Sequence, residues 1–191
     1  MTDALLYAHI ISFALVLLVA GAVHISEIQM ARAESVAVAR SALRTSVALG
    51  PGFGIGSVLI IATGYSLANR HVGGAKVGSA WVVAAIVGLV AINVFGAGVL
   101  GQRGKRLLAT FDGAPDGPLS SEQRARLHDR LLSVGGWTNT AIAFGIVGLM
   151  VRKPSGTGAV VTLVVAAIVG ALVGAIQHAA LGSRAPEPQP A

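Results

Sequence analysis

Cysteine is absent from the 191-residue chain. Its absence excludes disulfide bonds, thiolate metal sites, covalently attached c-type haem and cysteine nucleophiles. A bound metal ion would therefore need histidine, carboxylate or amide ligands. No nucleophile and base stand out as a pair, so a non-catalytic protein is favoured over an enzyme.

Charged residues are scarce: they make up 12% of the chain, against about 25% in a typical soluble domain. Hydrophobic residues make up 54%, and the mean hydropathy is +0.75. This composition predicts an integral membrane protein. The formal charge of +6 does not indicate nucleic-acid binding, because the basic residues lie between apolar blocks and form no single basic stripe. We expect these residues to set orientation and to contact anionic lipid of the bilayer.

The apolar blocks contain no lysine, which excludes a retinal Schiff base, and no acidic residue near their middle, which argues against a proton pump. Five blocks approach the roughly 20 residues that a helix needs to cross a bilayer. They span residues 5–26, 51–68, 79–101, 134–151 and 158–180. The predicted fold is therefore all-α, a polytopic transmembrane helical bundle.

Residues 1–182 are predicted to form one transmembrane domain, and the proline-rich residues 183–191 a disordered tail. Ten Lys and Arg residues fall on one side of the five spans and four on the other. Because basic residues accumulate on the cytoplasmic side, this distribution predicts a multi-pass protein of the plasma (inner) membrane with its N-terminus outside and its C-terminus inside.

Two inner segments are predicted to be helical. Residues 28–48 have no strong helix breaker and should extend the first helix beyond the membrane, while Pro51 should open the second span within its first turn. Residues 120–133 should form a cytoplasmic helix, which begins with the capping-box pattern of Ser120 and Gln123.

Two histidines lie near the ends of the first span. On an ideal helix, His9, Ser12, His24 and Glu27 fall within a sector about 120° wide, so this sector should face protein or water. His9 and His24 are about 22 Å apart along the helix, too far for one metal ion but suitable for two stacked b-type haems.

The fifth span carries a third histidine on a stripe of small residues. Gly170, Gly174 and His178 are spaced by four, which predicts close contact with a neighbouring helix. Alternating spans place His178 on the inner side with His24. These two imidazoles and the Glu27 carboxylate are a candidate set of ligands for zinc, copper or iron.

An outer site could use His9 and His71, and it is the weaker of the two hypotheses. For every one of these histidines, simple solvation at the membrane interface is the competing interpretation. His128 is assigned to the solvated surface of the second inner helix. Asn93 and residues 138–140 are typical of hydrogen bonds between helices.

A family resemblance rests on "LYAHIISFALVLLVAGAVHI", "GPGFGIGSVLIIATGYSLA", Trp81 and the basic "QRGKRL". Over residues 5–150 the chain resembles a bacterial family of predicted integral membrane proteins of unknown function. That family is distantly similar to copper-resistance D-type and J-type protoporphyrinogen oxidase membrane domains. The resemblance implies a haem or copper role for an early histidine, and only His9 matches it. Ala20 and Gly21 depart from the pattern, and the paired charges needed for porphyrinogen oxidation are missing.

These observations favour a redox or accessory membrane protein with a b-type haem or a transition metal between its helices. The candidate cofactor-binding residues are His9, His24, His71 and His178, and the candidate metal ligands are His24, Glu27 and His178. The alternative is a small transporter or channel-like bundle, or a structural subunit without cofactor. Its Gly and Ala faces would then contact other membrane subunits or a second copy in a homo-oligomer.

Overall fold

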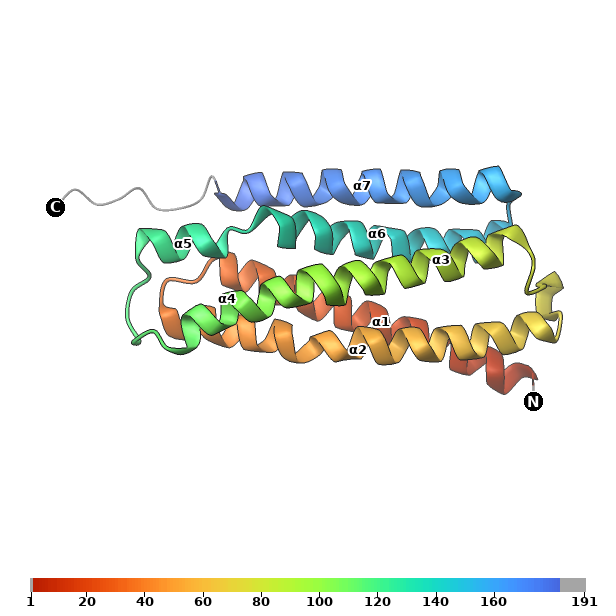
Figure 1. The fold of residues 1–191 in the computed structure, drawn as a ribbon, viewed down its shortest axis with the longest axis horizontal. Helices are drawn as coiled ribbons and strands as arrows, with labels where there is room; N and C mark the ends of the chain where they lie inside the picture. The colour runs from red at the N-terminus through yellow and green to blue at the C-terminus, as the bar shows by residue number, and fades with distance from the viewer. Residues whose placement is uncertain (1, 183–191) are drawn as a thin grey trace.

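Long apolar helices account for most of residues 2–182, which are the residues that this computed structural model describes (Figure 1). Five helical segments are long and apolar enough to cross a membrane, and no strand occurs within the described residues. The predicted all-α polytopic bundle is thus confirmed. The elements are α1 (Thr2–Ala31), α2 (Val36–Asn69), η1 (Val72–Gly74), α3 (Ala80–Phe95), η2 (Gly96–Gly101), α4 (Gln102–Asp112), α5 (Ser121–Leu127), α6 (Arg130–Arg152) and α7 (Gly156–Gly182).

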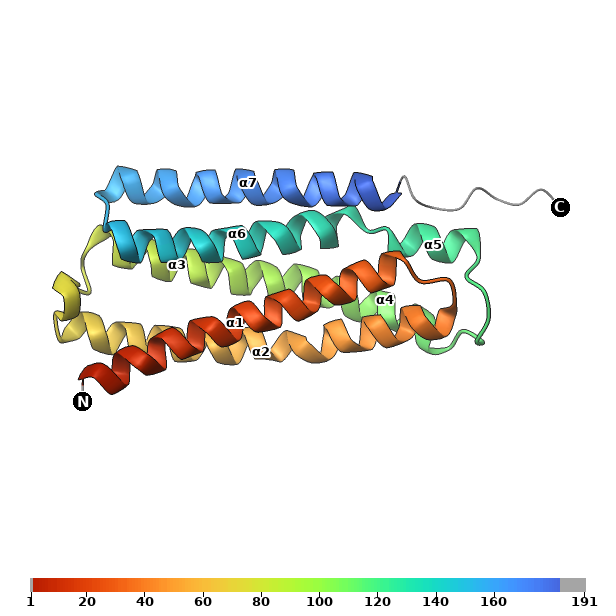
Figure 2. The ribbon, with the colours of Figure 1, turned by 180° about the vertical axis from the view of Figure 1, so that it is seen from behind.

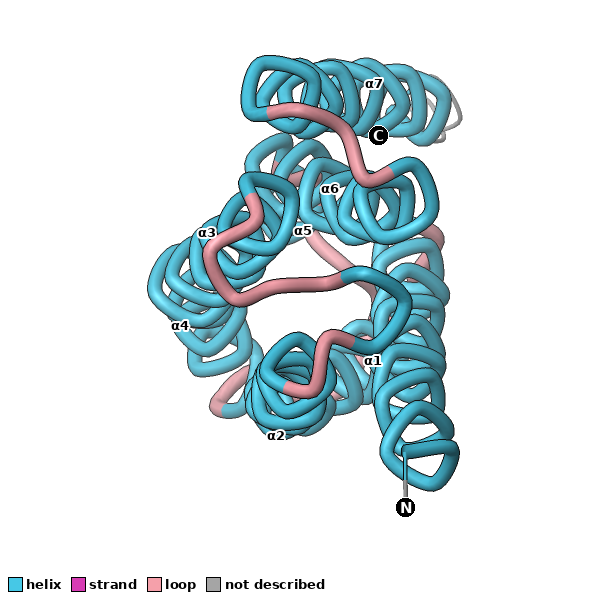
Figure 3. Tube along the Cα trace, turned by 90° about the vertical axis from the view of Figure 1, so that its right-hand side faces the viewer, coloured by secondary structure: helices cyan, strands magenta, loops and turns pink. Residues whose placement is uncertain are grey.

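The helices pack mainly as two pairs, α1 with α2 and α6 with α7 (Figure 2). Viewed along the bundle, α1, α2, α3 and α6 surround a common interior, and α7 lies outside them against α6 (Figure 3). Helix α1 begins at one end of the bundle and α7 finishes at the other (Figure 1). We call the end that contains α4, α5 and the last turn of α7 the basic end, because most of the Lys and Arg residues lie there. Which side of the membrane it faces stays a prediction.

The predicted extension of the first helix over 28–48 is wrong. Helix α1 ends at Ala31, and a new helix begins at Val36, where the Ser35 side chain accepts a hydrogen bond from the Val38 amide. The backbone between the helices is held by a distant segment: the Val36 amide donates to the Gly117 carbonyl at 2.9 Å. The chain breaks here because tertiary contacts replace helical hydrogen bonds.

Pro51 also differs from its prediction, since it lies inside α2 and not in a first turn. A proline inside a helix removes one backbone hydrogen bond and crowds the carbonyl four residues earlier. Membrane helices tolerate this where neighbouring helices support the backbone. Helix α2 is therefore continuous from the basic end to the far end of the bundle.

The third and fourth spans differ from their predicted bounds at the basic end of the bundle. The predicted span 79–101 continues without a stop through the π-helical turn η2 into α4. The predicted helix 120–133 is two helices, because the chain leaves helical geometry at His128 and Asp129 restarts it by accepting hydrogen bonds from the amides of Leu131 and Leu132. The capping box of Ser120 and Gln123 is confirmed.

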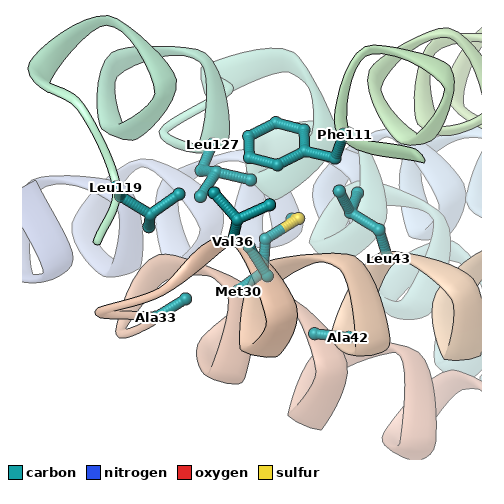
Figure 4. Packing of buried hydrophobic residues seen from close by; sticks show 9 residues of the cluster. Met30, Ala33, Val36, Ala42, Leu43, Phe111, Leu119 and Leu127 are labelled. Carbon is teal, nitrogen blue, oxygen red and sulfur yellow. The ribbon is translucent and has the colours of Figure 1, made fainter. Parts of the chain in front are cut away.

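A compact apolar cluster closes the basic end (Figure 4). It joins the last turn of α1, the start of α2, the end of α4 and helix α5. Phe111 and Leu43 are its most deeply buried large side chains, at 1% exposure each. The buried members are Met30, Ala33, Val36, Ala39, Ala42, Leu43, Phe111, Leu119 and Leu127.

Candidate functional site

His24 is the most fully engaged histidine of the bundle. Its Nδ1 lies 3.1 Å from Glu27 Oε2, one helical turn away on α1, and its Nε2 lies 2.9 Å from Thr140 Oγ1 on α6. The His24 and Glu27 side chains are only 11% and 12% exposed. The helical spacing predicted from the sequence therefore brings this imidazole and this carboxylate together inside the bundle.

An aromatic ring fixes the orientation of His24. Trp137 of α6 stacks on the imidazole with a centroid separation of 4.3 Å and an angle of 16°. The indole N–H donates to Gln177 Oε1 of α7 at 2.7 Å. Close approach is possible because residue 136 is glycine: a Cβ there would lie 3.2 Å from Glu27 Oε1. Three helices thus hold one imidazole.

The Thr140 hydroxyl suits both charge states of His24. When the imidazole is neutral and Nδ1–H donates to the Glu27 carboxylate, Nε2 accepts the Thr140 hydroxyl hydrogen. When the ring is protonated, Nε2–H donates and the same hydroxyl oxygen accepts. His24 can therefore gain or lose a proton without leaving a buried polar atom unpaired.

A small cavity of about 20 Å³ lies next to Glu27, at the basic end. This volume is enough for about one water molecule. Its polar lining comes from α1, the α5–α6 junction, the first turn of α6 and α7. These residues are Glu27, His128, Asp129, Ser133, Gln177 and His178.

His178 and His128 both line this cavity, and their rings are in contact. The ring centroids are 6.5 Å apart and the planes are inclined at 72°. His128 lies in the junction between α5 and α6, outside the apolar part of the span. Its burial, together with the nearby charges of His178 and Arg124, lowers the pKa of His128 below its ordinary value. His128 is half-buried, so it keeps part of its expected exposure and also contacts α7 through His178.

The predicted metal ligands are only partly assembled. His24 and Glu27 are bonded, whereas His178 lines the cavity beside Glu27 and contacts His128. Among residues 2–182, no group of three or more His, Asp or Glu side chains is positioned to hold a metal ion. The trio of His24, Glu27 and His178 stays a prediction.

The two histidines toward the far end of the bundle, His9 and His71, have separate surroundings. His9 Nδ1 lies 2.9 Å from Thr63 Oγ1 of α2, and the ring packs against Gly64, where a Cβ would approach it to 3.0 Å. His71 lies in a left-handed turn after α2, with Nδ1 3.4 Å from the Ala75 carbonyl oxygen. His9 is therefore hydrogen-bonded to α2, and its pairing with His71 stays a prediction.

Neutral polar side chains join the helices between the two buried histidines. Asn93 Nδ2 donates to Ser57 Oγ at 2.7 Å, and Asn139 Nδ2 donates to the Ile92 carbonyl at 3.3 Å. Both asparagines therefore form hydrogen bonds between helices, as predicted. Sequence reasoning missed Trp137 and Gln177, although a glutamine beside a glycine stripe in an apolar span is itself a signal of burial.

A b-type haem does not fit the residues around His24. Axial ligation needs a free imidazole nitrogen: Nδ1 of His24 is bonded to Glu27, as in many ligating histidines, but Nε2 is already bonded to the Thr140 hydroxyl. A cofactor of this size also needs a pocket of roughly 300 Å³ or more, far above the 20 Å³ cavity beside Glu27. His24 is thus arranged for hydrogen bonding and stacking.

The family described as predicted integral membrane protein, DUF2269, matches residues 3–154. The chain belongs to this family. The DUF2269 match supports the predicted relation to membrane proteins of unknown function, but not the more distant similarity to copper-resistance or oxidase domains. It covers α1 to α6 and stops before α7, so the His24–Glu27 pair lies inside the DUF2269 region whereas Gln177 and His178 lie beyond it. Neither a curated protein nor a solved structure matches the chain.

Proposed function

We propose that this membrane protein is a small channel-like bundle that conducts protons, with the His24–Glu27 pair as its proton-binding element. The observation that carries the proposal is the double hydrogen bonding of a buried imidazole, to a carboxylate on one side and a hydroxyl on the other. Ionisable residues inside a membrane are costly and typically serve ion or proton pathways. This element needs no cofactor, and it can exchange a proton without losing a hydrogen bond.

Polar pairs between helices support a path along the bundle. His9 with Thr63 lies toward the far end and His24 with Thr140 toward the basic end. Two further hydrogen bonds between helices are those of Asn93 with Ser57 and of Asn139 with the Ile92 carbonyl. Buried apolar residues, among them Val16, Ile60 and Leu89, separate the pairs, so conduction requires water to enter between them.

The absence of an acidic residue near the middle of any span is consistent with conduction and not with pumping. A pump needs an ionisable group whose access switches between the two sides. Passive conduction requires only hydrogen-bonding groups and transient water. The neutral Asn93 and Asn139 meet that need without the cost of a charge at the bilayer centre.

We expect proteoliposomes loaded with a pH-sensitive dye, and clamped electrically with potassium and valinomycin, to equilibrate protons at least about tenfold faster than empty liposomes. Glu27→Gln should return the rate to the empty-liposome level, because His24 then loses its charged partner. His71→Gln, which changes an exposed histidine at the far end, is the matched control and should conduct like the parent. A parent rate equal to that of empty liposomes would overturn the proposal.

The same purified protein tests the redox alternative. A haem would give a Soret band that disappears in His24→Asn or His9→Asn, and a metal would appear in elemental analysis. We expect neither. A Soret band that depends on one of these histidines would replace proton conduction with a haem-binding function.

Trp137 offers a direct optical test of protonation at His24. The chain has two tryptophans, so Trp81→Phe leaves Trp137 as the sole tryptophan, which is excited selectively at wavelengths that tyrosine does not absorb. A protonated imidazole over the indole face accepts an electron from the excited ring and quenches it. We expect emission from Trp81→Phe to fall on acidification, and this fall to vanish in Trp81→Phe/His24→Asn. An identical fall in both variants would show that His24 does not take up the proton.

A further inference from the structure

The geometry points to the cavity between α1, the α5–α6 junction and α7 as the proton vestibule of the bundle, with His128 and His178 relaying protons between Glu27 and the solvent at the basic end. This inference rests on the proposed proton conduction and adds the route of entry and exit. It is carried by the lining of the cavity, by an unpartnered buried donor and by the contact between the two imidazoles.

The unpartnered donor is Nε2 of Gln177. This atom is buried and has no hydrogen-bond partner in the described structure, while Oε1 of the same amide accepts from Trp137. A buried donor without an acceptor costs about 1–3 kcal/mol. Gln177 lines the 20 Å³ cavity, which has room for one water molecule to accept this hydrogen. The amide therefore indicates a hydrated cavity beside the Glu27 carboxylate.

The charged and titratable groups facing this cavity divide into fixed and exchangeable ones. Asp129 is fixed, because it caps α6 and pairs with Arg103. Arg124 of α5 adds a permanent positive charge near His128 and reaches the Ala33 carbonyl at 3.4 Å. The exchangeable groups are therefore Glu27, His128 and His178.

The two imidazoles are suited to a relay. Their centroids are 6.5 Å apart, and no described hydrogen bond occupies the ring nitrogens of either. Partial burial and the nearby His178 and Arg124 lower the pKa of His128, which favours its neutral form, and a neutral imidazole has one ring nitrogen that can accept a proton. A proton delivered to the cavity water is then within reach of the carboxylate that hydrogen-bonds to His24.

The vestibule is tested by labelling a single introduced cysteine, which will be the sole thiol because the chain contains no cysteine of its own. Ala31 lines the cavity, whereas Ala37 is an exposed alanine at the same end of the bundle. Ala31→Cys is reconstituted and its proton flux is measured before and after reaction with N-cyclohexylmaleimide, a neutral and membrane-permeant reagent. We expect the reaction to lower the flux at least about tenfold. Because the protein conducts before the reagent is added, a folding defect cannot account for the loss.

Ala37→Cys is the matched control and should keep its flux after complete labelling, which mass spectrometry measures. Equal flux before and after labelling of Ala31→Cys would overturn the vestibule and leave the proposed conduction intact. A parent protein without flux would instead overturn the proposed function itself.

The relay is tested by a second variant. His128→Gln/His178→Gln should conduct at least about tenfold more slowly than the parent, and a parent-like rate would exclude the relay.

Discussion

Gly174→Ala will lower the free energy of unfolding by about 3 kcal/mol. A Cβ at residue 174 would lie 2.6 Å from the Val134 Cα and 2.9 Å from the Ser133 carbonyl oxygen. Both are backbone atoms, so no side-chain rotation relieves the overlap and α7 must move away from α6. That movement also lengthens the hydrogen bond of 3.2 Å from the Ser133 hydroxyl to the Gly174 carbonyl. Circular dichroism during titration of detergent micelles with sodium dodecyl sulfate measures the loss.

Gly21→Ala is the control for this substitution. No atom lies within 4 Å of a Cβ built at Gly21, and alanine favours helix over glycine by about 1 kcal/mol, so this variant should match or exceed the parent in stability. Gly170→Ala should behave like Gly174→Ala, because its Cβ would lie 2.6 Å from the Trp137 carbonyl oxygen. Unchanged stability in Gly174→Ala would contradict the close packing of α6 and α7.

The glycine stripe illustrates what the sequence could predict. The spacing of Gly170, Gly174 and His178 predicted a close helix neighbour, and the neighbour is α6 of the same chain. The identity of that neighbour could not be read from the stripe, because any helix with small residues meets the same requirement. Gly170 and Gly174 are therefore already packed against α6 of the same chain. Self-association through other Gly and Ala faces stays a prediction.

The presence of five long apolar helices was predictable, and the positions of their ends were not. The five spans follow from runs of about 20 apolar residues. The end of α1 depends on two backbone hydrogen bonds to residues more than 80 positions away, from Val36 to Gly117 and from Leu119 to Glu34. No local breaker marks that position, so the sequence predicted a continuous helix. The inserted break is a tertiary effect.

The candidate site was predictable only along α1. The helical wheel correctly put His24 and Glu27 in one sector, since a single helix fixes their relation. Thr140 and Trp137 are supplied by α6, whose rotation depends on how its own glycines pack. Gly135 is one of them: a Cβ there would lie 2.7 Å from a Leu100 methyl group. Partners from another helix require the packed bundle.

Arg40→Gln will open the loop between α4 and α5, at a cost of about 2–3 kcal/mol. The guanidinium, only 17% exposed, donates from Nε to the Phe111 carbonyl at 2.9 Å, from Nη2 to the Ala114 carbonyl, and from Nη1 to Asp116 Oδ1 at 3.0 Å. Glutamine is too short and has too few donors to replace this set. Hydrogen–deuterium exchange measured by mass spectrometry should show faster exchange in the peptides that cover residues 111–120.

Arg44→Gln is the matched control, one turn along α2. Arg44 and Asp112 are 62% and 43% exposed, and an ion pair of this kind contributes about 0–1 kcal/mol. Its removal should leave exchange in the loop unchanged. Arg40→Lys should resemble Arg40→Gln, because an ammonium group cannot reach three acceptors in the fork geometry of a guanidinium. If Arg40→Gln exchanged no faster than Arg44→Gln, the apolar cluster around Phe111 alone would be holding the loop, and the arginine would be dispensable for closing the basic end.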